Sequence, residues 1–173
     1  MALGTDTKHY ETPNHPYQGE RIASEHSLLD RYGLKNKEEL WRAQSELRSY
    51  RREARDLLAQ AQDDPVVGRR TREFLGRLVR VGVLDEEDAL GDVLALEIED
   101  VLERRLQTVA YRKGLANTPQ QARQFIVHGH VTVGDRRLTV PSYVVDVDEE
   151  DTVDFDENSP LADDLHPERA EGQ

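Results

Sequence analysis

The sequence contains no cysteine and no long apolar run. Without cysteine the chain can form neither a disulfide nor a thiolate metal site. No stretch approaches the roughly 20 apolar residues that a membrane-spanning helix needs, and the N-terminal segment lacks the apolar centre of a secretory signal. Hydrophobic residues make up only 36% of the 173 residues. We therefore expect a soluble, cytoplasmic protein with small cores and no membrane partner.

Lysine is also scarce. Four of the 23 basic residues are lysines and the rest are arginines, against 35 acidic residues and a formal net charge of −12. Surface carboxylates in excess hold hydrated cations, and arginine is retained where its fork of N–H donors matters. The composition favours a halophilic acidic protein in a very salty cytoplasm. The alternative is an acidic protein of an ordinary cell.

The charge is distributed in blocks. Residues 42–80 carry ten basic and six acidic side chains, and residues 104–137 carry seven basic and one acidic. Residues 81–103 hold nine acidic side chains and no basic one, and residues 138–173 hold twelve and one. Affinity for nucleic acid depends on the local charge that faces the phosphates, not on the net charge. The two basic islands therefore indicate a polyanion-binding surface on an acidic chain.

Helical patterns dominate the first half of the chain. Ser24 or Ser27 is a candidate cap for a short helix ending near Gly33, and Asn36 with Glu39 has the spacing of a capping box for the next helix. Apolar residues then recur at helical spacing, namely at Leu40, Ala43, Leu47, Tyr50 and Ala54.

Proline and glycine punctuate the helices that follow. Pro65 interrupts the second helix, and a further apolar stripe ends near Gly82. The acidic segment beyond it predicts a short helix and then a longer one, which Asp92 caps and which ends at Gly114.

The next helix has the best-defined ends. Thr118 is placed to cap it, with Pro119 in its first turn and Gln121 completing a capping box. Gly129 suits its C-terminal end. Its buried stripe comprises Ala122, Phe125 and Ile126, and its opposite face comprises Gln120, Arg123 and Gln124.

A small sheet follows this helix. The stretch "HVTV-GD-RRLTV" predicts a hairpin with Gly134 and Asp135 in its turn. "SYVVDV" and "DTVDF" predict two more short strands, and the polar segment after Asn158 predicts a loose tail.

Together these patterns predict an α+β fold. The helical N-terminal half begins with an extended arm, and a small helix-loop-helix plus short antiparallel β-sheet forms an RNA-binding module. The expected divisions are the arm at 1–20, a helical domain at 21–102, the module at 103–155 and an acidic tail at 156–173.

The chemistry of the module suits a structured RNA. Guanidinium groups and a helix N-terminus bind phosphate, while glutamine and histidine can hydrogen-bond sugar or base edges. His128 and His130 have no third ligand at a useful spacing, so we expect no metal. No phosphate-binding Gly-Lys loop, nucleophile elbow or dinucleotide fingerprint occurs. We therefore expect no catalysis, no cofactor and no small-molecule substrate.

The stretch "ERRLQTVAYRKG", then "ARQFIVHGHVTV" and "VPSY", resembles the RNA-binding module named after small-subunit ribosomal protein S-four. The upstream segment "YETPNHPYQGERIASEHSLLDRYGLKNKEELWRAQSELR" is similar to the archaeal and eukaryotic branch of that ribosomal protein family. The chain departs from some bacterial relatives in lacking the cysteines of a zinc knob, and from many members in having Asp135 where asparagine is common.

The resemblance implies a structural constituent of the small ribosomal subunit. Such a protein binds small-subunit rRNA early, nucleates assembly of the subunit body, contacts ribosomal protein S-five and other small-subunit proteins, and contributes to translational accuracy. The implied RNA-binding residues of the module are Arg104, Arg105, Arg112, Lys113, Thr118, Arg123, Gln124, His128 and His130. The second island adds Arg42, Arg48, Arg51, Arg52 and Arg55. The alternatives are an RNA-modifying enzyme or a free-standing rescue factor that carries the same module.

Overall fold

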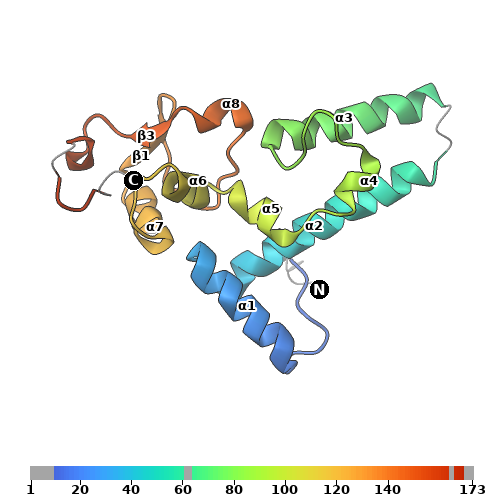
Figure 1. Cartoon of the computed structure of the whole chain (residues 1–173), viewed down its shortest axis with the longest axis horizontal. Coiled ribbons are helices and arrows are strands. Elements are labelled where there is room, and N and C mark those ends of the chain that lie inside the picture. The colour runs from blue at the N-terminus through green and yellow to red at the C-terminus, as the bar shows by residue number, and fades with distance from the viewer. Residues whose placement is uncertain (1–9, 61–63, 164–165, 170–173) are drawn as a thin grey trace, which may run out of the picture.

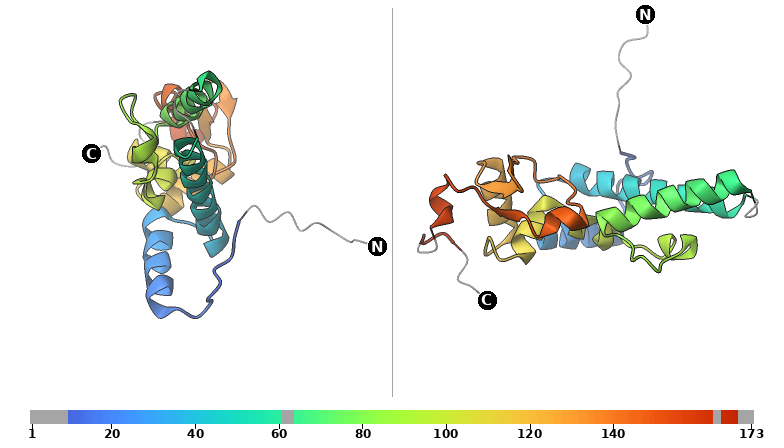
Figure 2. Two further views of the ribbon diagram at one scale, coloured as in Figure 1. Left: turned by 90° about the vertical axis from the view of Figure 1, so that its right-hand side faces the viewer. Right: turned by 90° about the horizontal axis from the view of Figure 1, so that it is seen from above.

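The computed structural model describes residues 10–60, 64–163 and 166–169. The molecule is elongated, with a pair of long helices at one end, the sheet at the other, and the first helix projecting to one side (Figure 1). A view from above shows the same long outline (Figure 2). The elements are α1 (Gly19–Tyr32), α2 (Lys37–Leu58), α3 (Pro65–Val81), α4 (Leu90–Val93), α5 (Ile98–Glu103), α6 (Leu106–Arg112), α7 (Pro119–Val127), β1 (Val131–Val133), β2 (Arg136–Arg137), α8 (Val147–Glu150), β3 (Val153–Phe155) and the 3-10 helix η1 (Pro160–Ala162).

Helices α2 and α3 form the long pair. The Asn36 side chain caps α2 by accepting from the backbone N–H of Glu39 at 3.1 Å. Pro65 opens α3, where its missing N–H and fixed φ are harmless. Helix α3 then runs back along α2 (Figure 1), and its Phe74 and Leu78 are buried in the core of this half.

The sheet-containing half has a core of its own, from Leu106 to Leu161. Its strands lie in the order β2-β1-β3, and both pairings are antiparallel. The alternate residues of β1 and β3 are buried, as the period of a strand requires. The predicted α+β class is confirmed, and β1 and β2 form the predicted hairpin. The boundaries proposed for arm, helical domain, module and tail stay predictions.

Helix α1 begins at Gly19, so the predicted start at Ser24 or Ser27 is wrong. Arg21 donates to the carbonyl oxygens of two preceding loop residues at 2.8 and 3.2 Å. Because these bonds fix the loop against the first turn, the helix forms upstream of both serines.

The acidic segment forms three short helices, α4, α5 and α6, where a short and a long one were predicted. Asp92 caps α4, not the later helix, by accepting from the backbone N–H of Ala89 at 2.9 Å. The long helix is interrupted before α6 because the backbone N–H of Leu106 donates to the Tyr143 carbonyl at 2.7 Å. A contact distant in sequence therefore replaces a helical hydrogen bond.

The segment that contains Tyr143 was predicted to be a strand. In the segment 142–147, Val144 forms only an isolated bridge with Arg105, so the strand predicted from "SYVVDV" is wrong. The strand predicted from "DTVDF" is confirmed as β3.

The predicted tail is not wholly loose. Leu161 of η1 is buried in the core of the sheet-containing half, and the side-chain amide of Gln121 donates to the Glu168 carbonyl at 2.9 Å. The prediction failed here because one leucine within a polar segment is enough to hold it against a core. Residues 164–165 and 170–173 of the tail lie outside the described residues.

The predicted arm also touches its own chain. The rings of Tyr10 and Trp41 lie 6.1 Å apart, and the backbone N–H of Glu11 donates to the Ser45 hydroxyl at 3.0 Å. Residues 1–9 lie outside the described residues. The arm is therefore anchored to α2 at Tyr10 and Glu11.

Gly33 joins α1 to α2 at the point where both approach the other half. Its φ of 59° lies in the left-handed region. A Cβ there would lie 2.8 Å from Nε2 of Gln107 and 2.9 Å from Cβ of Pro119. Gln107 is fully buried, and its amide donates to the Gly33 carbonyl at 2.8 Å and to the Pro119 carbonyl at 2.9 Å.

Gly33→Ala should therefore lower the free energy of unfolding by about 3 kcal/mol, because left-handed strain of about 1–2 kcal/mol adds to the clash. The matched control is Gly114→Ala, which has φ 77° but open space around its Cβ and should be destabilised by only about 1 kcal/mol. Urea denaturation in molar salt measures both. Equal destabilisation would contradict the close contact at Gly33.

Candidate nucleic-acid interface

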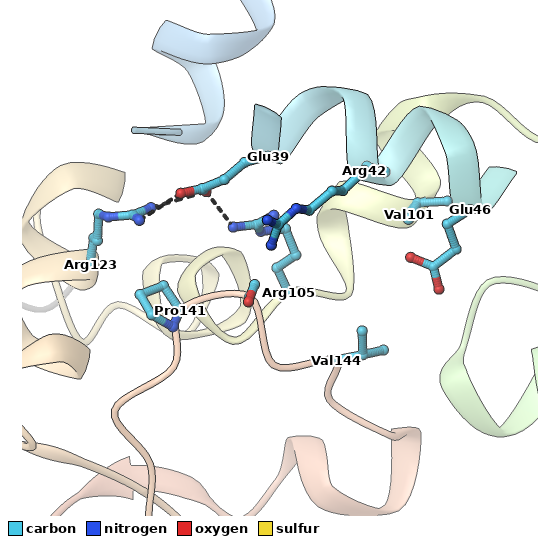
Figure 3. Close-up of a pocket in the computed structure, with 10 residues that line it drawn as sticks. Glu39, Arg42, Glu46, Val101, Arg105, Arg123, Pro141 and Val144 are labelled. Carbon is cyan, nitrogen blue, oxygen red and sulfur yellow. Dashed lines mark hydrogen bonds and ion pairs between the residues drawn. The ribbon is translucent and has the colours of Figure 1, made fainter. Parts of the chain in front are cut away.

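Glu39, in the first turn of α2, is shared by two arginines of the other half (Figure 3). Arg123 of α7 donates to its carboxylate from both terminal nitrogens, at 2.7 and 3.1 Å. Arg105, directly before α6, donates to it at 2.6 Å. Arg105 is only 6% exposed. One carboxylate thus connects α2, α6 and α7 through charge-assisted hydrogen bonds.

The two arginines lower the pKa of Glu39. Burial alone raises the pKa of this carboxyl, but the hydrogen bonds and charges of Arg123 and Arg105 outweigh burial, so the pKa lies below its ordinary value of 4.5. Burial lowers the pKa of the Arg105 guanidinium, and the charge of Glu39 opposes this. Arginine starts so high that Arg105 stays protonated.

The roles of these residues differ from the sequence expectation. Glu39 does not complete a capping box with Asn36, because its carboxylate is held by the arginines. Arg123 does not project freely from its helix, because it is half-buried against Glu39 and also donates to the side-chain oxygen of Gln107 at 3.2 Å. Sequence reasoning missed Gln107, whose only signal was a polar residue at an apolar-facing helix position.

A cavity of about 280 Å³ opens beside this cluster, between α2, α7 and the loop after β2. Arg42 lies at the cavity (Figure 3); it is exposed and forms no ion pair with the described residues. Three arginines and two glutamates line the space, so it keeps a positive excess of one charge, which suits an anionic group of the size of a phosphate. The lining residues include Glu39, Arg42, Glu46, Arg105, Arg123, Pro141, Ser142 and Val144.

The other predicted arginines of α2 lie elsewhere on the helix. Arg48 pairs with Glu11 of the arm at 2.6 Å. Arg51 donates to a loop carbonyl before α5, and Arg55 donates through Nε to the Arg51 carbonyl at 3.1 Å. Arg52 is exposed and has no hydrogen bond or ion pair within the described residues. The structure therefore separates Arg42 from the other four.

Three predicted residues next to or within α6 also bind their own chain. Arg104 pairs with Glu150 of α8 at 2.8 Å, and Arg112 pairs with Glu103 at 2.7 Å. Lys113 donates to the backbone carbonyl of Glu150 at 2.7 Å and to that of the next residue at 3.0 Å. Arg112 and Lys113 nevertheless remain exposed at the end of α6.

The remaining predicted residues lie along α7 and its end. Thr118 caps the helix by accepting from the backbone N–H three residues on, at 3.1 Å. Gln124 and His128 are exposed and form no hydrogen bond through their side chains within the described residues. His130 is half-buried, and its Nδ1 lies 2.9 Å from the Ser159 hydroxyl.

The described ranges contain no group of three or more side chains placed to hold a metal ion. The rings of His128 and His130 lie 6.1 Å apart. Within the same ranges no helix is long and apolar enough to cross a bilayer.

Comparison with known proteins identifies the family. The family model described as "S4 domain" matches residues 104–152. The chain is 71% identical to the small ribosomal subunit protein uS4 of Natronomonas pharaonis, over all of both chains. It is 65% identical to that of Haloarcula marismortui, over all of this chain and 99% of the relative, and 50% identical to that of Methanococcus aeolicus, over 95% and 93%.

The chain belongs to the uS4 family. The resemblance recognised in the sequence is confirmed, and it extends through the helical half as well as the S4 domain. As a uS4 family member the chain is a structural ribosomal protein, and the prediction that it is not an enzyme is confirmed. The Glu39 cluster thus joins the S4 domain of a uS4 protein to its helical half.

Glu39→Gln should lower the free energy of unfolding by about 3 kcal/mol at neutral pH, because it leaves Arg105 buried without a counter-charge. The pKa of Glu39 is lowered, so its contribution is complete above about pH 4.5 and disappears as the pH falls through the lowered pKa. The difference between wild type and variant should therefore shrink in that acid range. Denaturant titrations from pH 3 to pH 7 measure it.

The neighbouring Glu38→Gln is the control, because Glu38 is exposed in the same first helical turn. It should cost less than about 1 kcal/mol. A difference for Glu39→Gln that stays constant with pH would refute the role of its ionised form.

Proposed function

We propose that the chain binds small-subunit rRNA directly and early, and thereby nucleates assembly of the subunit body in the cytoplasm. The observation that carries the proposal is the cavity in which Arg42, Arg105 and Arg123 meet at the junction of the two halves. Membership of the uS4 family and the S4 domain at residues 104–152 support rRNA as the partner. A phosphate of the rRNA backbone is the group that these guanidinium forks fit.

The cluster is prepared for such a ligand before it binds. Glu39 holds Arg105 and Arg123 in fixed positions, so binding restricts little further side-chain freedom. One carboxylate shared between two guanidinium groups leaves a positive excess of one charge, and Arg42 and Glu46 of the same cavity balance each other. The Nε of Arg105 has no hydrogen-bond partner in the described residues. The junction therefore presents positively charged guanidinium groups in fixed positions.

We propose two kinds of role for the predicted residues. The side chains that are exposed without an ion pair contact the RNA: Arg42, Arg52, Gln124 and His128. Those engaged within the chain position this surface and add contacts where they are exposed: Arg48, Arg51, Arg55, Arg104, Arg105, Arg112, Lys113, Thr118, Arg123 and His130.

We further propose that the chain contacts ribosomal protein S-five and contributes with it to translational accuracy. The support is the resemblance to the family together with the carboxylates of residues 81–103, which suit a basic protein neighbour better than RNA. At molar salt the Debye length is about 3 Å, so these carboxylates do not repel an rRNA bound elsewhere on the chain.

Arg42→Ala should weaken binding to small-subunit rRNA about tenfold, because a charge-assisted contact is worth about 1.5 kcal/mol or more. Its fold should stay intact, since Arg42 is exposed. Arg31→Ala is the control: Arg31 is an exposed arginine of α1 that pairs with Glu99 at 2.9 Å, and its removal should change affinity less than about threefold. Filter binding in molar KCl measures both. Equal effects would contradict a site at the cavity.

The chain should remain with small subunits when ribosomes are washed at high ionic strength. A structural protein is held by many contacts buried during assembly, whereas a rescue factor binds an accessible surface. Sedimentation after washes of rising KCl concentration tests this. Release at the concentration that removes bound translation factors would favour the rescue factor.

A further inference from the structure

Helix α3 carries a second set of arginines that neither the S4 domain nor the cavity uses. Its 17 residues include five arginines and one acidic residue, Glu73. Arg77 pairs with Glu53 of α2 at 2.9 Å and lies over the Phe74 ring. The other four are exposed and have no hydrogen bond or ion pair within the described residues: Arg69, Arg70, Arg72 and Arg80.

Three of these arginines form one stripe. At about 100° per residue, Arg69, Arg72 and Arg80 fall within an arc of roughly 80°, and they span about 16 Å along the helix axis. The buried Phe74 and Leu78 point to the opposite side, into the core with α2. The stripe therefore faces outward along α3, which lies beside α2 and whose C-terminal end reaches α8 (Figure 1).

Gly76 lies in the middle of this stripe. A Cβ built there meets nothing within 4 Å, so packing inside the protein does not require glycine. A glycine inside a helix costs about 0.5–1 kcal/mol relative to alanine, and glycine is the usual residue where a ligand comes close to the backbone. The arginines thus flank a position where the helix backbone is bare.

We propose that Arg69, Arg72, Gly76 and Arg80 form a second RNA contact, which holds the phosphate backbone of a base-paired rRNA segment against α3. The inference rests on the proposed function and adds a site to it. No aromatic side chain lies on the stripe to stack unpaired bases. Guanidinium forks along a smooth helix suit phosphates of a double helix, which proteins recognise by shape and backbone.

The first test removes two of the charges. The double variant Arg72→Gln, Arg80→Gln should bind small-subunit rRNA at least about tenfold more weakly. A plot of log affinity against log salt should become shallower by about 2, because the slope falls by about one for each phosphate that is no longer neutralised. The control Arg77→Gln removes a charge from the same helix but from a side chain already paired with Glu53. It should leave the slope unchanged.

The second test adds a side chain at Gly76, in the middle of the stripe. Gly76→Gln should raise the melting temperature, since the helix gains propensity, and yet lower rRNA affinity at least about threefold. Gly68→Gln is the matched control, because Gly68 is the other glycine of α3, also has open space around its Cβ, and lies outside the arc. It should raise the melting temperature without changing affinity.

The outcomes separate this site from the cavity. If Arg42→Ala weakens binding and the α3 variants do not, the stripe is not an RNA contact and only the present inference fails. If the α3 variants reduce the slope and Arg42→Ala has no effect, the stripe stands and the cavity fails. If the α3 variants bind free rRNA normally but dissociate from assembled subunits, the partner is an acidic protein and the inference is overturned.

Discussion

The ion cluster of Glu39 with Arg105 and Arg123 is the interaction on which the arrangement of the two halves depends. Each half has its own hydrophobic core, and the two cores meet where α5 gives way to α6. A connection made by apolar contacts alone would tolerate sliding, because such contacts have no direction. The shared carboxylate binds in a fixed geometry from two sides, and so it sets how α2 lies against α6 and α7.

The buried amide of Gln107 completes this junction. It reaches the carbonyls at the end of α1 and at the start of α7 and accepts from Arg123. Burying a polar side chain is costly unless it is hydrogen-bonded. Moving any of these partners away would leave the buried amide unpaired, so the hydrogen bonds fix their positions. The absence of a side chain at Gly33 is a consequence, because a Cβ there would lie only 2.8 Å from the amide nitrogen of Gln107.

The proposed RNA site at this junction would reconcile RNA binding with a net charge of −12. The geometry divides the basic residues of the described ranges into two groups. Some arginines form ion pairs with acidic side chains of the same chain, as Arg104 does with Glu150 and Arg112 with Glu103. Others, such as Arg42 and Arg52, are exposed and have no ion pair within the described residues, and these are the ones we propose as RNA contacts. Since close contacts act below the screening length, this division matters more than the total charge.

The sequence by itself determined the fold class, the family, the cap at Asn36, the interruption at Pro65, and the helix and hairpin that follow Thr118. These features depend on residues close to one another in the chain, where capping, turn chemistry and periodicity act directly. Tertiary structure alone decided the break between α5 and α6, the absence of a strand at 142–147 and the packing of Leu161. It also decided that Glu39 serves Arg105 and Arg123 instead of its own helix cap. In each case a partner more than 30 residues away satisfies a hydrogen bond, a charge or an apolar surface, and local patterns carry no information about a group that only folding brings near.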